Sequence, residues 1–496
     1  MFQRILIANR GEIAVRFIRA CREMGIESVA VYSDADAAAQ HVAQADAAVR
    51  IGPAAASESY LSVEAIIAAA RSVGADAVHP GYGFLSENQA LPAACDSAGL
   101  AFIGPPASVI EQMGSKIAAR QLAARAGAPV VPGETPTDQS DAAIAAAARR
   151  VGLPLLLKPA EGGGGIGMKA VRDEAALLPA IARARREAQA AFGDGTLYVE
   201  RLIDRPRHVE FQIIADHHGR IVHVFERECS IQRRHQKVIE ETPSTAVTPA
   251  LRRRMGDAAV AVARAAGYRN AGTVEFLLEG TGDDAAFYYL EMNTRLQVEH
   301  PITEQVAGVD LVRAQILVAA GEPLPWAQEA LSQRGHAIEV RIYAEDPARD
   351  DLPQAGPLLL YRPPSMPGIR IDSGFDEGDV VSVHYDPLIA KLIASGETRE
   401  IARRRTLAAL RSFPILGIRT NAALLIGLLE HPRFISGDLD TQFLDSEGPL
   451  LRARLASEPS SEIGALAAAV DSSAGGGHDS PPQAADPWAL LKGVRV

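Results

Sequence analysis

The sequence predicts a multidomain protein that combines α/β and α+β domains, and three observations support this. The chain has 496 residues, which corresponds to about three domains at roughly 150 residues each. Its first 110 residues alternate short apolar runs with helical patterns, whereas strand-like runs predominate beyond residue 207. Apolar residues make up 47% and charged residues 22% of the chain, which is typical of folded domains and not of disordered chains.

The N-terminal region is predicted to be a doubly wound α/β domain. Four short apolar runs, at 4–8, 28–32, 75–79 and 101–104, are typical of buried strands. Apolar residues at helical spacing predict helices over 12–24 and 62–73. Strand–helix alternation of this kind predicts parallel strands joined by right-handed crossovers.

The rest of the chain is predicted to mix helices and strands. A proline-marked linker begins near residue 127, a helix is expected over 141–150, and a strand over 155–158. Later strands are expected at 208–215, 220–226, 273–279, 286–291, 336–344, 356–361 and 380–395. Further helices are expected at 249–266, 399–412 and 421–430. The Ser-, Gly-, Ala- and Pro-rich composition of 457–487 predicts a flexible tail.

Charge and cysteine content exclude several classes of protein. The formal net charge is −11, which argues against nucleic acid or an anionic membrane as the main partner. Three cysteines, Cys21, Cys95 and Cys229, give no disulfide framework or zinc motif. No apolar window approaches the roughly 20 residues of a membrane span, and we recognise no signal peptide. The prediction is a cytoplasmic protein.

A glycine run, Gly162 to Gly167, follows the strand expected at 155–158. The next residues resemble a strand and not the helix that a dinucleotide-binding loop requires. We therefore expect an antiparallel hairpin whose backbone N–H groups could cover an anion; a surface hairpin without a ligand is the alternative. Lys158 ends the apolar strand, where an unpaired ammonium is costly to bury, and this favours a bound phosphate. Lys116 alone is typical of a solvated helix.

Two carboxylates are expected on paired strands. Glu275 and Glu291 lie in neighbouring strand-like segments joined by a polar turn, and Asn293 follows two residues later. Oxygen ligands of this kind suit Mg²⁺ that is shared with substrate phosphates. An exposed polar sheet face is the alternative interpretation.

Arg295, Gln297 and Glu299 follow at alternate positions, so an extended backbone would direct all three to one side. Arginine can clamp a planar oxyanion, glutamine can add a hydrogen bond, and glutamate can act as a general base. A solvated edge strand explains the pattern equally well.

A second polar segment spans 226–237. It is typical of a solvated face, although an anion-binding loop remains open, and Cys229 is interpreted as a small packing residue.

Together these segments resemble the ATP-grasp superfamily, and specifically biotin carboxylase, over about residues 1–450. The matching motifs lie at 7–14, 79–88, 161–167, 206–210, 232–237 and 291–300. The resemblance implies an N-terminal (pre-ATP-grasp) α/β domain over 1–112 and an ATP-grasp unit over 113–330, with its lid at about 130–203. A mixed C-terminal domain would span 331–450, followed by a flexible linker and tail over 451–496.

The resemblance also implies a set of site residues. ATP would be contacted by Lys116, Lys158, Gly164, Gly165, Glu200, His208, Gln232, His235, Glu275, Leu277 and Glu291. Magnesium or manganese would be held by Glu275, Glu291 and Asn293. Bicarbonate and biotin would be bound by Lys237, Arg295, Gln297, Val298 and Arg341. The implied catalytic residues are Arg295, Glu299, Lys237 and Arg341, with Glu299 as the base.

The implied reaction is ATP- and bicarbonate-dependent carboxylation of biotin through carboxyphosphate, the first half-reaction of an acyl-CoA carboxylase. The implied partners are a biotin carrier protein or domain, a carboxyltransferase and a second copy of the chain. The family's carrier motif, Ala/Val-Met-Lys-Met, is absent from this sequence. Biotin should therefore come from another polypeptide, unless the chain is part of a longer one.

One residue departs from the family pattern. Ile166 stands in the glycine run where the family usually has Arg or Lys, so we expect weaker ATP affinity or altered lid closure. Two rival functions stay open: another ATP-grasp carboxylate–amine ligase, and a nucleotide-binding regulatory subunit.

Overall fold

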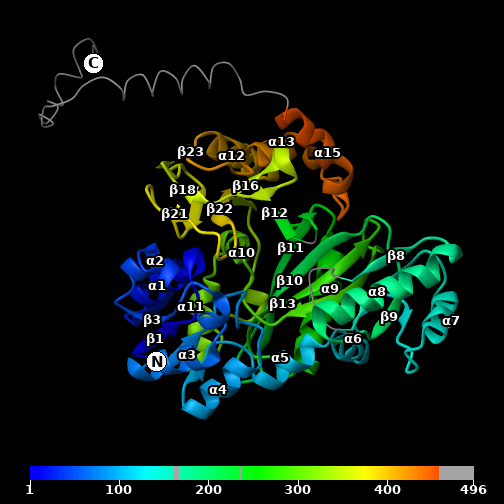
Figure 1. The fold of residues 1–496 in the computed structure, drawn as a ribbon, viewed down its shortest axis with the longest axis horizontal. Helices are drawn as coiled ribbons and strands as arrows, with labels where there is room; N and C mark the ends of the chain where they lie inside the picture. The colour runs from blue at the N-terminus through cyan, green and yellow to red at the C-terminus, as the bar shows by residue number, and fades with distance from the viewer. Residues whose placement is uncertain (161–166, 235, 457–496) are drawn as a thin grey trace, which may run out of the picture.

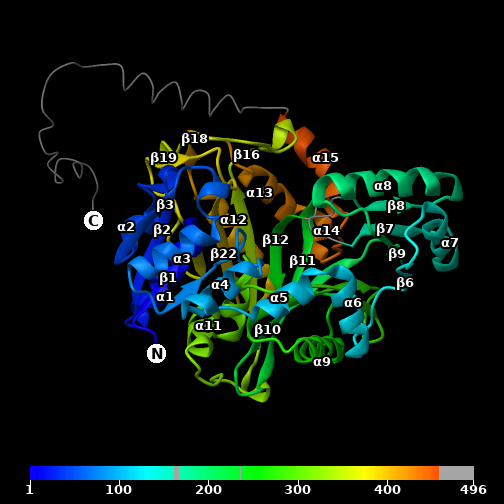
Figure 2. The same cartoon turned by 60° about the horizontal axis from the view of Figure 1, so that its bottom comes forward.

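The computed structural model describes residues 1–160, 167–234 and 236–456. Gly164, Gly165, Ile166 and His235 therefore lie outside the described residues, as does the segment 457–496, where the tail was predicted. In Figures 1 and 2 the N-terminal domain and the region containing β6–β9 lie at opposite sides of the molecule, with a long sheet between them. None of the helices in the described part of the chain has the length and apolarity needed to cross a bilayer.

The N-terminal domain is a parallel sheet with strand order β3-β2-β1-β4-β5. Its strands are β1 (Arg4–Ile7), β2 (Glu27–Ser33), β3 (Ala47–Gly52), β4 (Ala77–His79) and β5 (Ala101–Phe102). Its helices are α1 (Gly11–Glu23), α2 (Gln40–Gln44), α3 (Val63–Ser72) and α4 (Ala90–Ala98). The predicted α/β domain is confirmed, but the sequence did not predict β3. This edge strand is exposed at alternate positions and carries little apolar signal.

The next region forms a small four-stranded antiparallel sheet with two covering helices, which we call the lid. The sheet order is β6-β9-β7-β8, and β7 pairs antiparallel with β8 across the glycine run, as predicted. The lid elements are β6 (Gly133–Glu134), α7 (Asp141–Val151), β7 (Leu155–Pro159), β8 (Lys169–Val171), α8 (Leu177–Phe192) and β9 (Leu197–Arg201). The helices α5 (Ala107–Gly114) and α6 (Lys116–Arg125) lead into it.

An eight-stranded sheet of order β14-β13-β10-β11-β12-β15-β22-β20 runs through the molecule. Its first five strands are β10 (Arg207–Ala215), β11 (Ile221–Arg233), β12 (Gln236–Thr242), β13 (Asn270–Glu279) and β14 (Ala286–Asn293). The helices between and after them are α9 (Pro249–Ala265), α10 (His300–Ala307) and α11 (Leu311–Ala319).

The other three strands of this sheet come from the C-terminal region: β15 (His336–Tyr343), β20 (Ile369–Ser373) and β22 (Leu388–Gly396). Short strands surround them: β16 (Glu345–Asp346), β17 (Leu352–Pro353), β18 (Gly356–Pro357), β19 (Leu360–Tyr361), β21 (Val380–Val381) and β23 (Ile415–Leu416). The C-terminal helices are α12 (Arg399–Arg411), α13 (Ala422–Glu430), α14 (Pro432–Ser436) and α15 (Phe443–Ala456). The expected domain boundary at residue 330 thus separates β12 from β15, which are neighbours in one sheet.

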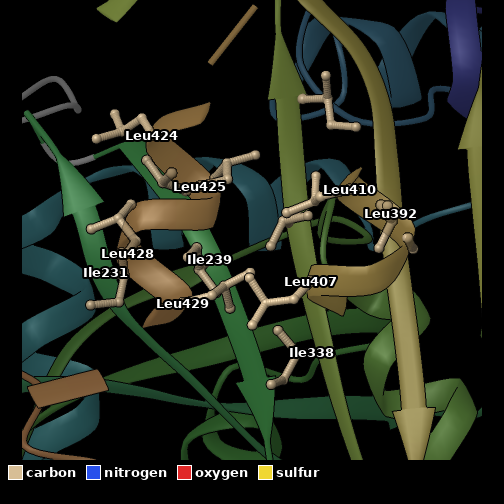
Figure 3. Packing of buried hydrophobic residues seen from close by; sticks show 14 of the residues in the cluster. Ile231, Ile239, Ile338, Leu392, Leu407, Leu410, Leu424, Leu425, Leu428 and Leu429 are labelled. Atoms are coloured by element: carbon tan, nitrogen blue, oxygen red, sulfur yellow. The ribbon is translucent and has the colours of Figure 1, made fainter. Parts of the chain in front are cut away.

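Side-chain alternation places apolar residues on one face of this sheet and the polar residues of the site on the other. On β10, Val209, Phe211 and Ile213 belong to the core that includes α9 residues, so His208 and Glu210 face the other way. At the other end of the sheet, Figure 3 shows leucines of α12 and α13 against Ile239, Ile338 and Leu392. The helices α9, α12 and α13 therefore cover this first face. The second face carries the polar side chains of the site described next, and α10 packs against an apolar part of it.

Candidate active site

A cleft of about 700 Å³ has lining residues from the lid, the central sheet and the C-terminal region. Most of the predicted site residues that the structure describes line it: Lys116, Lys158, Glu200, His208, Gln232, Lys237, Glu275, Leu277, Glu291, Asn293, Arg295, Gln297, Val298 and Arg341. Glu299 lies just behind the cleft wall, fully buried, and bonds to two of these residues. The structure thus brings distant parts of the sequence to one place.

Lys237 is the centre of the polar cluster. Its Nζ lies 2.8 Å from Glu275 Oε1, 2.7 Å from Glu299 Oε1 and 2.5 Å from Glu210 Oε2. Burial alone would lower the pKa of Lys237, but these carboxylates raise it well above the usual value. The ammonium is therefore charged across the physiological range.

Glu299 is held between two cations. Lys237 contacts one oxygen, and Arg341 NH2 donates to the other at 2.9 Å. Burial alone would raise the pKa of Glu299, but the charges of Lys237 and Arg341 outweigh burial and hold it well below the usual value. The carboxylate is therefore ionised in the folded protein.

The predicted metal ligands are direct cross-strand neighbours. Glu275 pairs with Glu291 between β13 and β14, and Asn293 Nδ2 donates to Glu275 Oε1 at 2.8 Å. Burial raises the pKa of Glu291, and the charge of Glu275 raises it further. Two carboxylates so placed repel each other, and a divalent cation would offset that repulsion, so the donor set fits Mg²⁺.

A second potential ligand group includes Glu275. The ligand atoms of His208, Glu210 and Glu275 lie within 4.8 Å of one another. His208 Nε2 is 2.8 Å from Glu275 Oε2. Lys237 already contacts both carboxylates of this group, Glu210 and Glu275. The group is therefore a poorer cation site than Glu275 with Glu291.

Lys158 differs from its sequence interpretation. It is buried, but it is paired: its Nζ donates to Glu200 Oε2 at 3.0 Å and lies 5.4 Å from the centre of the Tyr198 ring. Arg120 reaches the other oxygen of Glu200 at 3.1 Å. The ammonium of Lys158 therefore does not need a bound phosphate as its partner. The residue does line the cleft.

The prediction of an extended strand over 295–299 is wrong. The backbone bends after β14 and turns into α10, with Glu299 immediately before the first helical residue. The three side chains nevertheless meet one cluster, because Arg295 NH1 donates to Gln297 Oε1 at 2.9 Å and Gln297 Nε2 reaches Glu275 at 3.3 Å. A turn, and not alternation, brings them together.

The interpretation of 226–237 as a solvated face or loop is also wrong for most of the segment. Residues up to Arg233 continue β11, and β12 begins at Gln236. Arg227 is completely buried and donates to Glu210, Gln212, Thr273 and Thr303. Cys229 is buried, as expected of a packing residue.

Several residues of the site were not predicted from the sequence. Glu210 binds Lys237, Glu240 on β12 accepts from Arg341 Nε at 2.6 Å, and Glu87 accepts from Arg295 Nε at 2.9 Å. The alternating polar residues His208, Glu210 and Gln212 within apolar β10 were a signal for Glu210. Glu87 lies in the 79–88 motif, but its contact with Arg295 depends on the packing of two domains.

Three family models match the chain. They are "Biotin carboxylase, N-terminal domain" over residues 1–110, "Carbamoyl-phosphate synthase L chain, ATP binding domain" over 115–327 and "Biotin carboxylase C-terminal domain" over 339–446. Together they cover most of the described residues.

Individual proteins match as well. The chain is 50% identical to a biotin carboxylase of Halalkalibacterium halodurans over 444 residues, which are 90% of this chain and 97% of that protein. It is 49% identical to the mitochondrial methylcrotonoyl-CoA carboxylase subunit alpha of Rattus norvegicus over 89% of this chain, but spans only 61% of that longer protein.

A solved structure has the same fold. It is the biotin carboxylase domain dimer of Hydrogenobacter thermophilus 2-oxoglutarate carboxylase in complex with MgADP, ADP and bicarbonate. The TM-score is 0.86 at 42% identity, covering 91% of this chain and 99% of that one.

Proposed function

Because the chain belongs to the biotin carboxylase family, we propose that it carboxylates biotin on a carrier protein, using ATP and bicarbonate. The observation that carries the proposal is the buried Lys237–Glu299–Arg341 cluster, which joins the predicted metal ligands to the predicted base. Such a cluster suits a reaction in which an anion is deprotonated beside nucleotide phosphates.

The first step of the proposed reaction uses the residues around Lys237 and Glu299. Lys237, Arg295 and Gln297 would bind bicarbonate, with Val298 beside them, and the ionised Glu299 would accept its proton, so that bicarbonate attacks the γ-phosphate of ATP. The products of this step are carboxyphosphate and ADP. Most of the acceleration would come from positioning and from fixed charges.

Carboxyphosphate then breaks down to CO₂ and phosphate, and the phosphate takes the proton from the ureido nitrogen of biotin. Arg341 would stabilise the resulting enolate, on which CO₂ is captured. Its guanidinium is anchored for this by Glu240 and Glu299.

ATP would lie between the lid and the polar sheet face, near Lys116, Lys158, Glu200, His208, Gln232 and Leu277. Glu275, Glu291 and Asn293 would hold Mg²⁺ or Mn²⁺, which neutralises phosphate charge in reactions of this class. The expected contacts of Gly164, Gly165 and His235 belong to this proposal on the family resemblance alone.

We infer the partners from the same relationship. A biotin carrier protein or domain and a carboxyltransferase would complete the reaction, and a homodimer is supported by the dimeric 2-oxoglutarate carboxylase domain. The final acceptor differs among relatives, which include methylcrotonoyl-CoA and 2-oxoglutarate carboxylases. A cytoplasmic location is supported by three buried, unpaired cysteines.

The test is bicarbonate-dependent release of ADP by the purified chain, with and without free biotin. We expect biotin to stimulate turnover, Arg341→Ala to abolish the stimulation, and Glu299→Gln to lower kcat by about 10²- to 10⁴-fold. The matched controls, Arg362→Ala and Glu377→Gln, change a surface ion pair whose residues do not line the cleft. They should leave kcat unchanged.

Two outcomes would contradict the proposal. Turnover that ignores biotin but responds to an amine would favour another ATP-grasp ligase. Nucleotide binding without bicarbonate-dependent hydrolysis would favour a regulatory subunit.

A further inference from the structure

Two buried glutamates, Glu240 and Glu339, lie near Arg341, and Glu240 anchors its guanidinium. Glu240 on β12 and Glu339 on β15 are direct cross-strand partners, so their side chains leave the sheet on the same face, with Cβ atoms about 4.5–5.5 Å apart. Neither residue is accessible to solvent. Glu240 Oε1 accepts from Arg341 Nε, while Arg341 NH2 reaches Glu299.

The hydrogen bonding of this pair is incomplete. Within the described residues, Glu240 Oε2 and both carboxylate oxygens of Glu339 have no hydrogen-bond partner. A buried ionised carboxylate without donors is costly. One proton shared by the two groups removes a charge and supplies the missing donor.

Several neighbours of Glu339 are apolar. Ala337 precedes it by two positions on the same face of β15, and Ile393 lies directly opposite on β22. Both belong to a small apolar cluster with Ile302 and Val306 of α10, which covers this face. These neighbours disfavour an ionised carboxylate at Glu339.

The charged groups that act on Glu339 are Lys391 from β22, Glu240 from β12, Arg341 from its own strand and Glu299 before α10. Burial raises the pKa of Glu339 well above its usual value, and Glu240 adds to the shift against the pull of Lys391 and Arg341. The Lys391 ammonium is already bound to Glu12 and to the carbonyl of Val298. Burial also raises the pKa of Glu240, to about 7.

We propose that Glu339 is a positioning residue, a neutral carboxylic acid that donates its proton to the free oxygen of Glu240 and so fixes the anchor of Arg341. This inference rests on the proposed function, in which Arg341 stabilises the biotin enolate. Loss of the proton from Glu339 would place two negative charges face to face and release Glu240 from its anchoring geometry.

The first experiment tests protonation without using activity. The infrared difference spectrum between the wild type and Glu339→Gln should contain the C=O stretching band of a protonated carboxylic acid. The control is Glu226→Gln, because Glu226 is equally buried but accepts two hydrogen bonds from Arg252 and should contribute no such band. A Glu339 difference spectrum without the acid band would overturn the inference.

The second experiment tests the positioning role. Activity with biotin should fall on the alkaline side in the wild type as Glu339 ionises. Glu339→Gln, whose amide stays a neutral donor, should keep biotin stimulation and lose that alkaline limb. Glu339→Leu should lower kcat/KM for biotin by about tenfold with an unchanged KM for ATP.

The inference would be contradicted if Glu339→Gln kept the alkaline fall in activity of the wild type. It would also be contradicted if this variant lost stimulation by biotin. If the wild type itself shows no biotin-dependent turnover, the proposed function fails, and the infrared result still decides whether Glu339 holds a proton.

Discussion

At the scale of single residues, Lys237 balances the negative charge of the carboxylates in the cleft. Its ammonium contacts Glu210, Glu275 and Glu299, which come from β10, from β13 and from the turn before α10. Without this cation, three buried carboxylates would face one another, and at least one would take up a proton. Lys237 therefore helps Arg341 to keep Glu299 ionised for its proposed role as base.

Ile166 stands in the glycine run where we expect the family to have Arg or Lys, and this expectation allows a direct prediction. Ile166→Arg should lower the KM for ATP by about 10- to 100-fold, because a charge-assisted hydrogen bond to a phosphate contributes about 1.5–3 kcal/mol. The measurement is the ATP dependence of bicarbonate-dependent ADP release. Ile166→Gln is the control, since it adds polarity without charge. An unchanged KM for ATP in Ile166→Arg would show that a positive charge at this position does not contribute to ATP binding.

Some site residues could be predicted from the local sequence pattern, and the structure confirms that pattern. Others were predicted only from the resemblance to the family. Glu275 and Glu291 could be predicted because a short hairpin fixes their pairing locally. Glu240 and Glu339 could not, because they meet only when β12 pairs with a strand about a hundred residues later. A single sequence carries no direct signal for such pairing.

At the scale of elements, Glu241 links the central sheet to two elements of the C-terminal region. It lies on β12 and is buried, and it accepts hydrogen bonds from Arg399 of α12 while lying 2.7 Å from His336 Nε2 of β15. Burial alone would raise the pKa of Glu241, but His336 and Arg399 lower it to about 2. The folded state thus favours the ionised carboxylate.

This gives a stability prediction with a defined pH dependence. Because the pKa in the folded state lies below the ordinary value, the stabilisation is present at neutral pH and is lost as the pH falls from about 4.5 towards 2. Glu241→Gln should lower the free energy of unfolding by about 3–5 kcal/mol at neutral pH. Chemical denaturation at neutral pH and at about pH 3 would measure this.

The difference between Glu241→Gln and the wild type should shrink at the acidic pH. Glu377→Gln, at an exposed ion pair, is the control and should show no measurable change at either pH. A pH-independent difference would mean that Glu241 acts through packing and not through its charge.

The sequence predicted helices and strands correctly where the apolar residues had a clear period. It failed where a strand buries charged residues. The strand expected at 220–226 extends to Arg233, because Glu226, Arg227 and Glu228 are buried with partners from neighbouring elements. Charge density normally indicates exposure, so the sequence favoured a surface segment. The partners that overturn this, such as Glu210 and Arg252, are specified only by the fold.

At the scale of the whole molecule, the lid and the sheet face share one binding cleft, so ligands should stabilise the entire chain. MgADP at a hundred times its Kd should add about 2.7 kcal/mol to stability, measured as a rise in the midpoint of thermal unfolding. Chelating Mg²⁺ should remove part of this rise.

The double variant Glu275→Gln, Glu291→Gln should respond to ADP equally with and without Mg²⁺. Glu279→Gln, on the same strand but outside the cleft-lining residues, should keep the wild-type response. A Mg²⁺ effect that survives in the double variant would place the metal elsewhere.

The eight-stranded sheet has a consequence for how this protein can be divided. The family models for the ATP-binding and C-terminal parts end at residue 327 and begin at 339, yet β12 from one and β15 from the other are hydrogen-bonded neighbours. A fragment cut between them would expose the backbone of an interior strand, which is a template for association with other chains. The sequence modules are therefore not separable folding units, and the two parts should unfold together as one cooperative body.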